Sequence, residues 1–255
     1  MNKLSSNLEL FLEQQYCVSL SRNQVSSYPF VFSDLLNESK QDQILTNHAT
    51  ELDHPPLAIV GSLFAKRFSV YCMAALSSVS LFDKQLPVSP DKIHFSIIQQ
   101  AQMVYQIDRH DIVSVDYSTS SNRKKSVNRY INQLYELLTT IIKSVSSYTG
   151  IHPNTMWSLI SHNLHNLYLR LKERCVDTVF DKRLPYILED RALLNEQNPD
   201  NFTYYCHPEQ TEQYFYLRKH CCLAFKLNSN HGYCLTCPRI SNSVRDATIT
   251  KKTQR

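Results

Sequence analysis

Glycine is scarce in this chain, which contains only Gly61, Gly150 and Gly232 among its 255 residues. β-sandwiches and the phosphate-binding loops of α/β folds need glycine at their turns, so its scarcity favours a helical protein. The sequence accordingly contains no GxGxxG motif and no Walker A motif. Both common types of glycine-rich nucleotide-binding loop are thereby excluded.

The sequence also lacks the motifs of hydrolytic enzymes and of secreted proteins. It contains no HExxH motif, no Ser-His-Asp residues in the order of a known catalytic triad and no paired-carboxylate motif, so the sequence gives no support to a hydrolytic activity. The N-terminal stretch MNKLSSNLELFLEQQ lacks the apolar core and cleavage site of a secretory signal. Lys66 and Arg67 interrupt the longest apolar run, Leu57 to Phe82, which therefore reads as a buried core helix. We expect a cytoplasmic protein with reduced thiols.

An excess of charge is confined to the C-terminal end. The net charge is +4, and residues 238–255 hold five of the 27 basic residues but only one of the 23 acidic ones. The remaining basic and acidic residues balance, which argues against a nucleic-acid-binding face and against nucleic acid as a partner. We expect residues 241–255 to form a basic, disordered tail.

Helical periodicity dominates the rest of the chain. The strongest pattern runs from Ser126 to Tyr148, with apolar residues three and four positions apart and Gly150 as a stop signal. Further helices are expected over residues 3–16, 57–82, 153–175 and 184–195. The runs KIHFSII and MVYQI indicate strands near 92–107, and the alternation around NSNHG indicates a hairpin over 221–237. The predicted fold class is α+β, mainly α-helical, with a small antiparallel β element and a C-terminal cysteine-bearing hairpin.

This pattern suggests four regions. A helical and irregular N-terminal region, 1–54, ends before the helix-breaking pair Pro55-Pro56. A helical body follows over 55–205. Residues 206–240 form a cysteine-rich segment, and 241–255 form the tail.

The segment HCCLAFKLNSNHGYCLTCPR holds four of the eight cysteines: Cys221, Cys222, Cys234 and Cys237. Four thiolates suit either a 2Fe–2S cluster or a structural zinc ion. Adjacent cysteines on a regular strand point to opposite faces, so they converge on one small ion only if the backbone kinks. A cluster with two separated ligand pairs tolerates that divergence better. The spacing therefore favours the cluster, and a zinc site and unligated thiols remain as alternative interpretations.

Basic residues flank the four cysteines. Arg218, Lys219 and His220 precede the first, and Arg239 follows the last. They form either a solvated strand face or a positive surface that attracts an anionic ferric complex or an acidic electron donor. The single cysteines at 17, 72 and 175 lie in apolar helical patterns, so we expect small buried hydrophobic side chains there and not ligands.

The segment RKHCCLAFKLNSNHGYCLTCP resembles the C-terminal signature of the FhuF-like ferric-siderophore reductases, a Cys-Cys pair followed by a CxxC. LAIVGSLFAKRFSVYCMAAL and TGIHPNTMWSLISHNLHNL are similar to that family's helical body, so the resemblance covers roughly residues 55–240. It implies that Cys221, Cys222, Cys234 and Cys237 ligate a 2Fe–2S cluster. Eleven residues separate the two cysteine pairs, one more than is usual in the family, and we expect the extra residue at a hairpin tip over 228–231.

The function that the resemblance implies is the one-electron reduction of siderophore-bound Fe(III) to Fe(II), which releases iron in the cytoplasm. The implied partners are a ferric siderophore and an electron donor, either a protein or a reduced flavin. The family's setting also allows peripheral contact with the cytoplasmic face of the inner membrane. Two alternatives stay open: a siderophore-binding module without redox activity and a zinc-stapled interaction protein.

Overall fold

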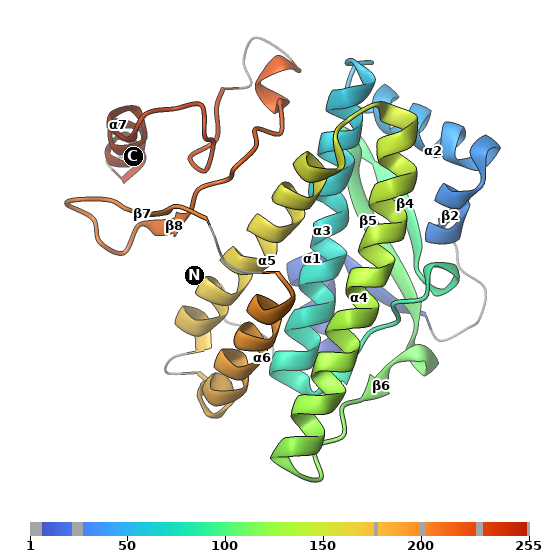
Figure 1. The fold of residues 1–255 in the computed structure, drawn as a ribbon, viewed down its shortest axis with the longest axis vertical. Coiled ribbons are helices and arrows are strands. Elements are labelled where there is room, and N and C mark those ends of the chain that lie inside the picture. Colours follow the sequence, from blue (N-terminus) through green and yellow to red (C-terminus); the bar gives the residue numbers. More distant parts are fainter. Residues whose placement is uncertain (1–6, 22–27, 176–177, 199–201, 228–231, 254–255) are drawn as a thin grey trace.

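The computed structural model describes residues 7–21, 28–175, 178–198, 202–227 and 232–253. Within these ranges the chain forms seven α-helices and eight strands. In Figure 1 the long helices α3 (Leu57–Phe82), α4 (Ser120–Thr149) and α5 (Pro153–Cys175) lie side by side, with a sheet behind them and the C-terminal residues beside one end. The α+β, mainly α-helical fold class that the sequence predicts is confirmed.

Helix α3 is the centre of the core, with 19 of its 26 residues buried. By length and composition it could cross a membrane, but 67% of its most apolar window is buried inside the protein. The buried hydroxyls of Ser69 and Ser78 donate to carbonyl oxygens of the same helix. Internal bonds of this kind let a helix carry serines inside an apolar core. The core-helix interpretation of this segment therefore holds.

The ends of α4 follow from local capping chemistry. The Thr119 hydroxyl accepts a hydrogen bond from the Asn122 N–H (3.1 Å), so the helix begins at Ser120, six residues before the predicted start. Gly150 ends it with φ 69°. At this end α4 approaches α3 closely, because a Cβ placed on Gly61 would lie 2.3 Å from Thr149 Oγ1. Helix α5 then starts at Pro153, as predicted, and α6 (Leu184–Gln197) packs against α4 and α5.

The sheet confirms the strands expected near 92–107 and adds others. Its order is β1-β5-β4-β2, built from β1 (Val18–Ser21), β2 (Phe30–Val31), β4 (His94–Ile98) and β5 (Gln102–Asp108). Strand β1 runs parallel to β5, whereas the other pairs are antiparallel, so the sheet is mixed. A smaller antiparallel pair joins β3 (Lys84–Gln85) to β6 (Val113–Ser114). The sequence did not indicate β1, because VSLS is short and half polar.

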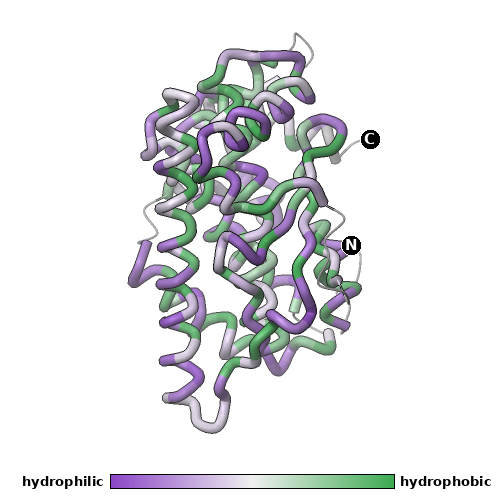
Figure 2. Tube along the Cα trace, turned by 90° about the vertical axis from the view of Figure 1, so that its right-hand side faces the viewer, coloured by the Kyte–Doolittle hydropathy of each residue, from purple (hydrophilic) through white to green (hydrophobic). Residues whose placement is uncertain are grey.

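The N-terminal region belongs to the same core as the helical body. It contains α1 (Leu8–Tyr16), the 3-10 helix η1 (Phe32–Leu36) and α2 (Glu38–Thr50). Phe11, Leu12 and Phe32 are buried against the core that includes α3. Figure 2 shows hydrophobic and hydrophilic positions alternating along the helical parts of the chain, as expected for elements with one buried face. The predicted boundary at residue 54 follows α2 but does not separate two cores.

The C-terminal residues depart from two sequence expectations. A cysteine-bearing hairpin is present, but it joins β7 (Tyr204–Cys206) to β8 (Tyr214–Tyr216) and does not span 221–237. Between Cys221 and Cys237 the described residues form the 3-10 helix η6 (Ala224–Lys226) and turns; the expected hairpin tip, 228–231, lies outside the described residues. The expected disordered tail instead forms α7 (Asn242–Thr253). Helix α7 packs on the hairpin through Tyr205, whose hydroxyl donates to Asp246 (2.5 Å).

A buried ionic network joins α3, α4 and α6. Asp190 of α6 is fully buried and accepts two hydrogen bonds from the guanidinium of Arg123 (2.7 and 2.9 Å) and one from Ser80 (2.8 Å). Arg123 also contacts Asp83, which in turn accepts from Arg183 (2.6 and 2.7 Å). Burial disfavours the Asp83 charge, but the hydrogen bonds from Arg183 and Arg123 outweigh it and hold the Asp83 pKa below its usual value.

We predict that Asp190→Leu lowers the free energy of unfolding by about 3–5 kcal/mol, because it leaves the Arg123 charge buried without its main partner. Adding Arg123→Met should recover much of that loss. Glu189→Gln is the matched control, since Glu189 is more exposed and contacts the same guanidinium at 3.3 Å; its cost should stay below about 1 kcal/mol. Denaturant unfolding of the wild-type protein and these three variants measures the effects. An unchanged midpoint for Asp190→Leu would contradict the prediction.

Candidate metal centre

Buried polar contacts fix the cysteine-rich segment on the helical body. In α5, His162 Nε2 lies 2.7 Å from the carbonyl oxygen of Tyr216, and the Asn166 side chain accepts from the Tyr216 N–H (3.0 Å). These contacts attach the end of β8. Six residues later, the Ser62 hydroxyl of α3 donates to the carbonyl oxygen of Cys222 (2.6 Å). The cysteine pair therefore lies over the first turns of α3.

The backbone at the cysteine pair leaves strand geometry, as the sequence predicts. Neither Cys221 nor Cys222 is in a strand, and Leu223 adopts the left-handed conformation with φ 60°. This conformation is uncommon for a branched side chain and turns the chain sharply. The hairpin expected over 221–237 would continue as a strand after Leu223, but η6 begins there instead. Leu223 and Leu227 pack against the core and hold the turn in place.

The sharp turn brings the four sulfurs together as two pairs. The Cys237 thiol donates to Cys221 Sγ at 3.6 Å, and Cys222 and Cys234 are joined by a hydrogen bond between their side chains. Each pair thus contains one sulfur from the Cys-Cys sequence and one from the CxxC. All four cysteines line one small pocket, with a volume of about 30 Å³, next to Lys66, Phe225 and Tyr233.

Over the described parts of the chain, no group of three or more Cys, His, Asp or Glu side chains is close enough together to hold a metal ion as the side chains stand. The four sulfurs face a shared space from two sides. Soft thiolate donors in two pairs match the needs of a binuclear iron–sulfur cluster, in which each iron takes two protein sulfurs.

Arg218 supplies the positive charge of the centre. Its side chain is only 4% exposed, and its Nη2 donates to Cys234 Sγ. The hydrogen bond from Cys234, together with the Arg218 charge, lowers the Cys222 pKa to about 4 against the effect of burial. Burial raises the Cys221 pKa, and the bond to Cys222 raises that of Cys234. Of these three sulfurs, the structure therefore favours negative charge at Cys222 and disfavours it at Cys221 and Cys234.

Arg245 of α7 holds the CxxC turn from behind. It is 1% exposed and donates to the carbonyl oxygens of Leu235 (2.7 Å), Cys237 (3.0 Å) and Ile240 (3.3 Å). Sequence reasoning missed Arg245, because the charge count of residues 241–255 indicated a solvated tail. The available signal was Ser241, whose hydroxyl accepts from the Val244 N–H (3.4 Å), as an N-cap serine does.

The four residues predicted to contact a substrate divide into two groups. Lys219, His220 and Arg239 are exposed and line a second pocket that also reaches Cys221. Arg218 does not line that pocket. Its buried side chain and its contact with Cys234 make it part of the thiol centre, which corrects its placement with the other three.

The other four cysteines lie elsewhere in the fold. Cys72 and Cys175 are buried in α3 and α5, and burial raises both thiol pKa values, that of Cys175 to about 11. Cys17 caps α1, where the Gln102 side chain donates to its sulfur (3.3 Å). Cys206 is exposed in β7. None of them lines the pocket of the four sulfurs.

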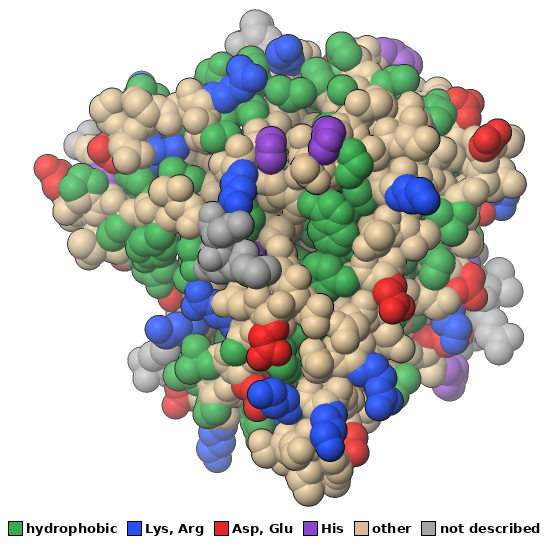
Figure 3. All heavy atoms as spheres, viewed as in Figure 1, with side chains coloured by type: hydrophobic (Ala, Val, Ile, Leu, Met, Phe, Trp, Pro, Cys, Tyr) green, Lys and Arg blue, Asp and Glu red, His purple; other side chains and the backbone are tan. Residues whose placement is uncertain are grey.

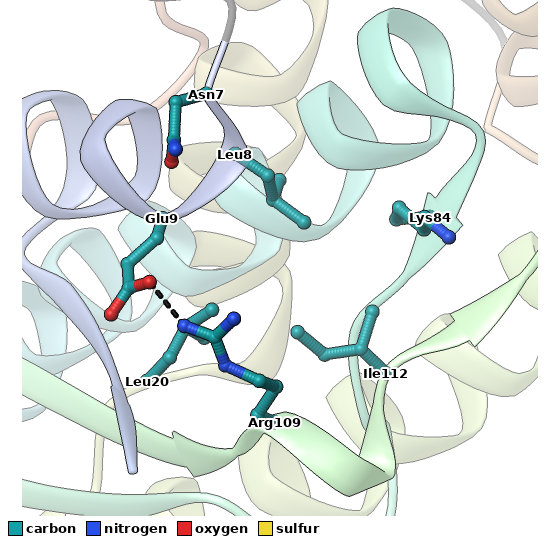
Figure 4. A pocket seen from close by; sticks show the side chains of 7 residues that line it. All are labelled: Asn7, Leu8, Glu9, Leu20, Lys84, Arg109 and Ile112. Carbon is teal, nitrogen blue, oxygen red and sulfur yellow. Dashed lines mark hydrogen bonds and ion pairs between the residues drawn. The ribbon is translucent and has the colours of Figure 1, made fainter. Parts of the chain in front are cut away.

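A further pocket, shown in Figure 4, is lined by Asn7, Leu8, Glu9, Leu20, Lys84, Arg109 and Ile112. Arg109 forms an ion pair with Glu9 across it, so its charge is already balanced. Its lining contains no cysteine or histidine. The soft ligands therefore belong to the C-terminal centre and not to this pocket.

We predict that replacing Cys221, Cys222, Cys234 or Cys237 with serine removes most of the bound metal, because each sulfur pair would lose one thiolate. Cys206→Ser is the matched control, as Cys206 is an exposed thiol from the same region. Cys17→Ser, Cys72→Ala and Cys175→Ala should also retain full metal content. Elemental analysis of the purified variants measures the outcome. Full loading of Cys222→Ser, or loss of metal from Cys206→Ser, would show that the ligands are misassigned.

No protein-family model matches the chain, and no curated protein matches it.

Proposed function

We propose that Cys221, Cys222, Cys234 and Cys237 hold a 2Fe–2S cluster and that the protein reduces siderophore-bound Fe(III) to Fe(II). The observation that carries this proposal is the arrangement of four thiols as two pairs around one pocket. The resemblance of the Cys-Cys and CxxC motif to FhuF-like reductases agrees with it. The residues around the sulfurs must also suit an iron–sulfur cluster.

The residues around the sulfurs fit a negatively charged iron–sulfur group. The N–H of Leu223 donates to Cys221 Sγ (3.4 Å), and the backbone of Ala224 donates to Cys222. Arg218 adds a charged donor at Cys234. Donors of this kind offset the charge on ligating sulfur and favour the reduced state of a cluster. The local charge and hydrogen bonding are thus those that an electron-transfer centre needs.

Reduction of iron makes few further demands on the protein. When bound, the cluster supplies single electrons for the reduction of Fe(III) and is reduced again by a donor protein or a reduced flavin. Siderophores hold Fe(III) through hard oxygen atoms, which bind the softer Fe(II) far more weakly, so reduction releases the metal. The tasks left to the chain are to hold the sulfurs near the surface and to bind the complex beside them. Cys221 and the exposed Cys234 meet the first requirement.

The setting proposed for this activity is the cytoplasm, with peripheral contact at the inner membrane as one possible arrangement. Charged side chains of both signs are scattered over the face shown in Figure 3, without a large patch of one sign. That distribution agrees with the balanced charge of residues 1–237 and gives no support to a nucleic-acid partner.

The decisive experiment is a visible absorption spectrum of anaerobically purified protein. We expect a reddish-brown chromophore that dithionite bleaches, with about two iron atoms and two sulfides per chain. The reduced protein should then produce Fe(II) from a ferric siderophore, detected with a ferrous chelator. The matched control is the Cys222→Ser variant, which should be colourless and inactive. A colourless wild-type protein with one zinc ion would refute the reductase and support a zinc-stapled module.

A second prediction concerns Arg218. Its charge lies against Cys234 Sγ, and a positive charge beside a cluster stabilises the reduced, more negative state. Arg218→Gln should therefore lower the midpoint potential by tens of millivolts, whereas Arg218→Lys should retain part of the wild-type value. Arg129→Gln, an exposed position on α4, is the control and should leave the potential unchanged. Redox titration of the visible spectrum measures the shift, and an unchanged potential in Arg218→Gln would contradict this role.

A further inference from the structure

A second pocket lies against the outer side of the thiol centre. It forms where α3 begins, where α4 turns into α5 and where the cysteine pair follows β8; Figure 1 shows the α4–α5 turn and the start of α3 at the same end of the molecule. Its volume of about 500 Å³ falls in the range of small-molecule binding sites. The apolar parts of its wall come from Ala58, Ile151, Leu223 and Pro238.

The polar lining of this pocket carries charge of one sign. Lys219 and Arg239 line it together with His152, His220 and Thr155, and no carboxylate is among its lining residues. Among the ion pairs between described residues, none involves Lys219 or Arg239. The two cationic groups therefore face the pocket without a neutralising partner in the described structure. A site of this kind attracts anions.

Aromatic rings hold both cations in position. The Lys219 ammonium lies 5.7 Å from the ring centre of Phe202, and the Arg239 guanidinium lies 5.5 Å from that of Phe225. Cation–π contacts restrict the side chains but leave the charge uncompensated. The planar guanidinium of Arg239 can then bind a carboxylate through two parallel hydrogen bonds, a geometry that suits anions with paired oxygen atoms.

Cys221 connects this pocket to the thiol centre. It lines both pockets and is partly exposed, whereas Cys222 is buried and lines the thiol pocket alone. A molecule in the second pocket therefore lies against a sulfur that we assign as a ligand. The distance over which an electron must travel is then about that of one cysteine side chain.

We infer that this pocket binds the ferric substrate and that the preferred substrates are anionic chelates with carboxylate groups, as in hydroxycarboxylate complexes of Fe(III). This inference rests on the proposed function for its redox step. There Fe(III) gains one electron and becomes Fe(II), the group held by the thiolates loses that electron, and the reduced flavin or donor protein restores it. No bond to the protein forms, and the freed chelate oxygens take protons from water.

An acidic face of the electron-donor protein is the other candidate for these charges. The volume of about 500 Å³ lies in the range of small-molecule sites and favours a small chelate, because a flat protein face would leave much of such a pocket unfilled. The two cases differ in a measurable way. If the donor uses the pocket, substitutions here slow cluster reduction by the donor without changing chelate affinity, and the inference is wrong.

The test uses gallium(III) complexes, because Ga(III) has the charge and coordination of Fe(III) but is not reduced under these conditions. Calorimetric titration of the cluster-loaded, full-length protein should show binding of gallium(III) citrate and at least tenfold weaker binding of a positively charged gallium(III) trihydroxamate. Arg239→Glu and Lys219→Glu should each weaken citrate-complex binding about tenfold or more. Arg129→Glu is the charge-matched control on exposed α4 and should leave the affinity unchanged. The visible spectrum and iron content should be the same in all variants.

The outcomes separate this inference from the proposed function. Binding of the anionic complex without any reduction of its Fe(III) counterpart would refute the reductase and keep the pocket. The pocket would be refuted, and the reductase kept, if ferric complexes are reduced but the anionic and cationic gallium probes bind with equal affinity. The same conclusion would follow if Arg239→Glu and Lys219→Glu leave the affinities unchanged.

Discussion

The hydrogen bond from the Ser62 hydroxyl to the Cys222 carbonyl is the contact on which the placement of the thiol centre depends. It is buried, and it joins a turn without regular structure to the most buried helix of the protein. Leaving that carbonyl without a donor would cost on the order of 1–3 kcal/mol, so the bond selects one position of the turn over α3. Gly61, the residue before Ser62, lets the end of α4 approach the same part of α3. The start of α3 thus organises both the thiol turn and the wall of the neighbouring pocket.

The centre combines features that have opposite electrostatic effects. Burial disfavours charged sulfur, whereas Arg218 and the backbone donors of Leu223 and Ala224 favour it. Arg245 acts on the carbonyl side of the CxxC turn, so two buried guanidinium groups neutralise the partial negative charges on either side of the sulfurs. Lys219 and Arg239 add charge farther out, where solvent reaches them. In the site that we propose, the uncompensated charges of Lys219 and Arg239 would attract an anion to the pocket that Cys221 also lines.

Regular periodicity made the helical body predictable, and local capping explained where its helices begin and end. Helix α4 has apolar residues at helical spacing with Gly150 after them, and both features act within the segment itself. Strand β1 was missed because its partner β5 lies more than 80 residues away, and VSLS carries little intrinsic preference. Helix α7 was missed because its sequence is polar, with Ile249 as its buried apolar residue, and its stability comes from packing on the hairpin. The cysteine motif identified the centre, but the alternating pattern around it suggested strands, and the positive φ of Leu223 overrides that pattern. The burial of Arg218 could not be read from a run of three basic residues.

The crossed pairing of the sulfurs also has a consequence for assembly. Because each pair takes one thiol from the Cys-Cys sequence and one from the CxxC, neither stretch of chain can fill half of the centre by itself. Both stretches must already be close before either iron position is complete, and the cofactor in turn would tie them together across residues 223–233. Binding of the cofactor and folding of this segment would then be a single cooperative event. In small metallodomains, likewise, the free energy of metal binding supplies the free energy of folding. An oxidant that destroyed the cluster would remove the electron carrier and would also release the wall of the substrate pocket. Substrate binding and reduction would then be lost together.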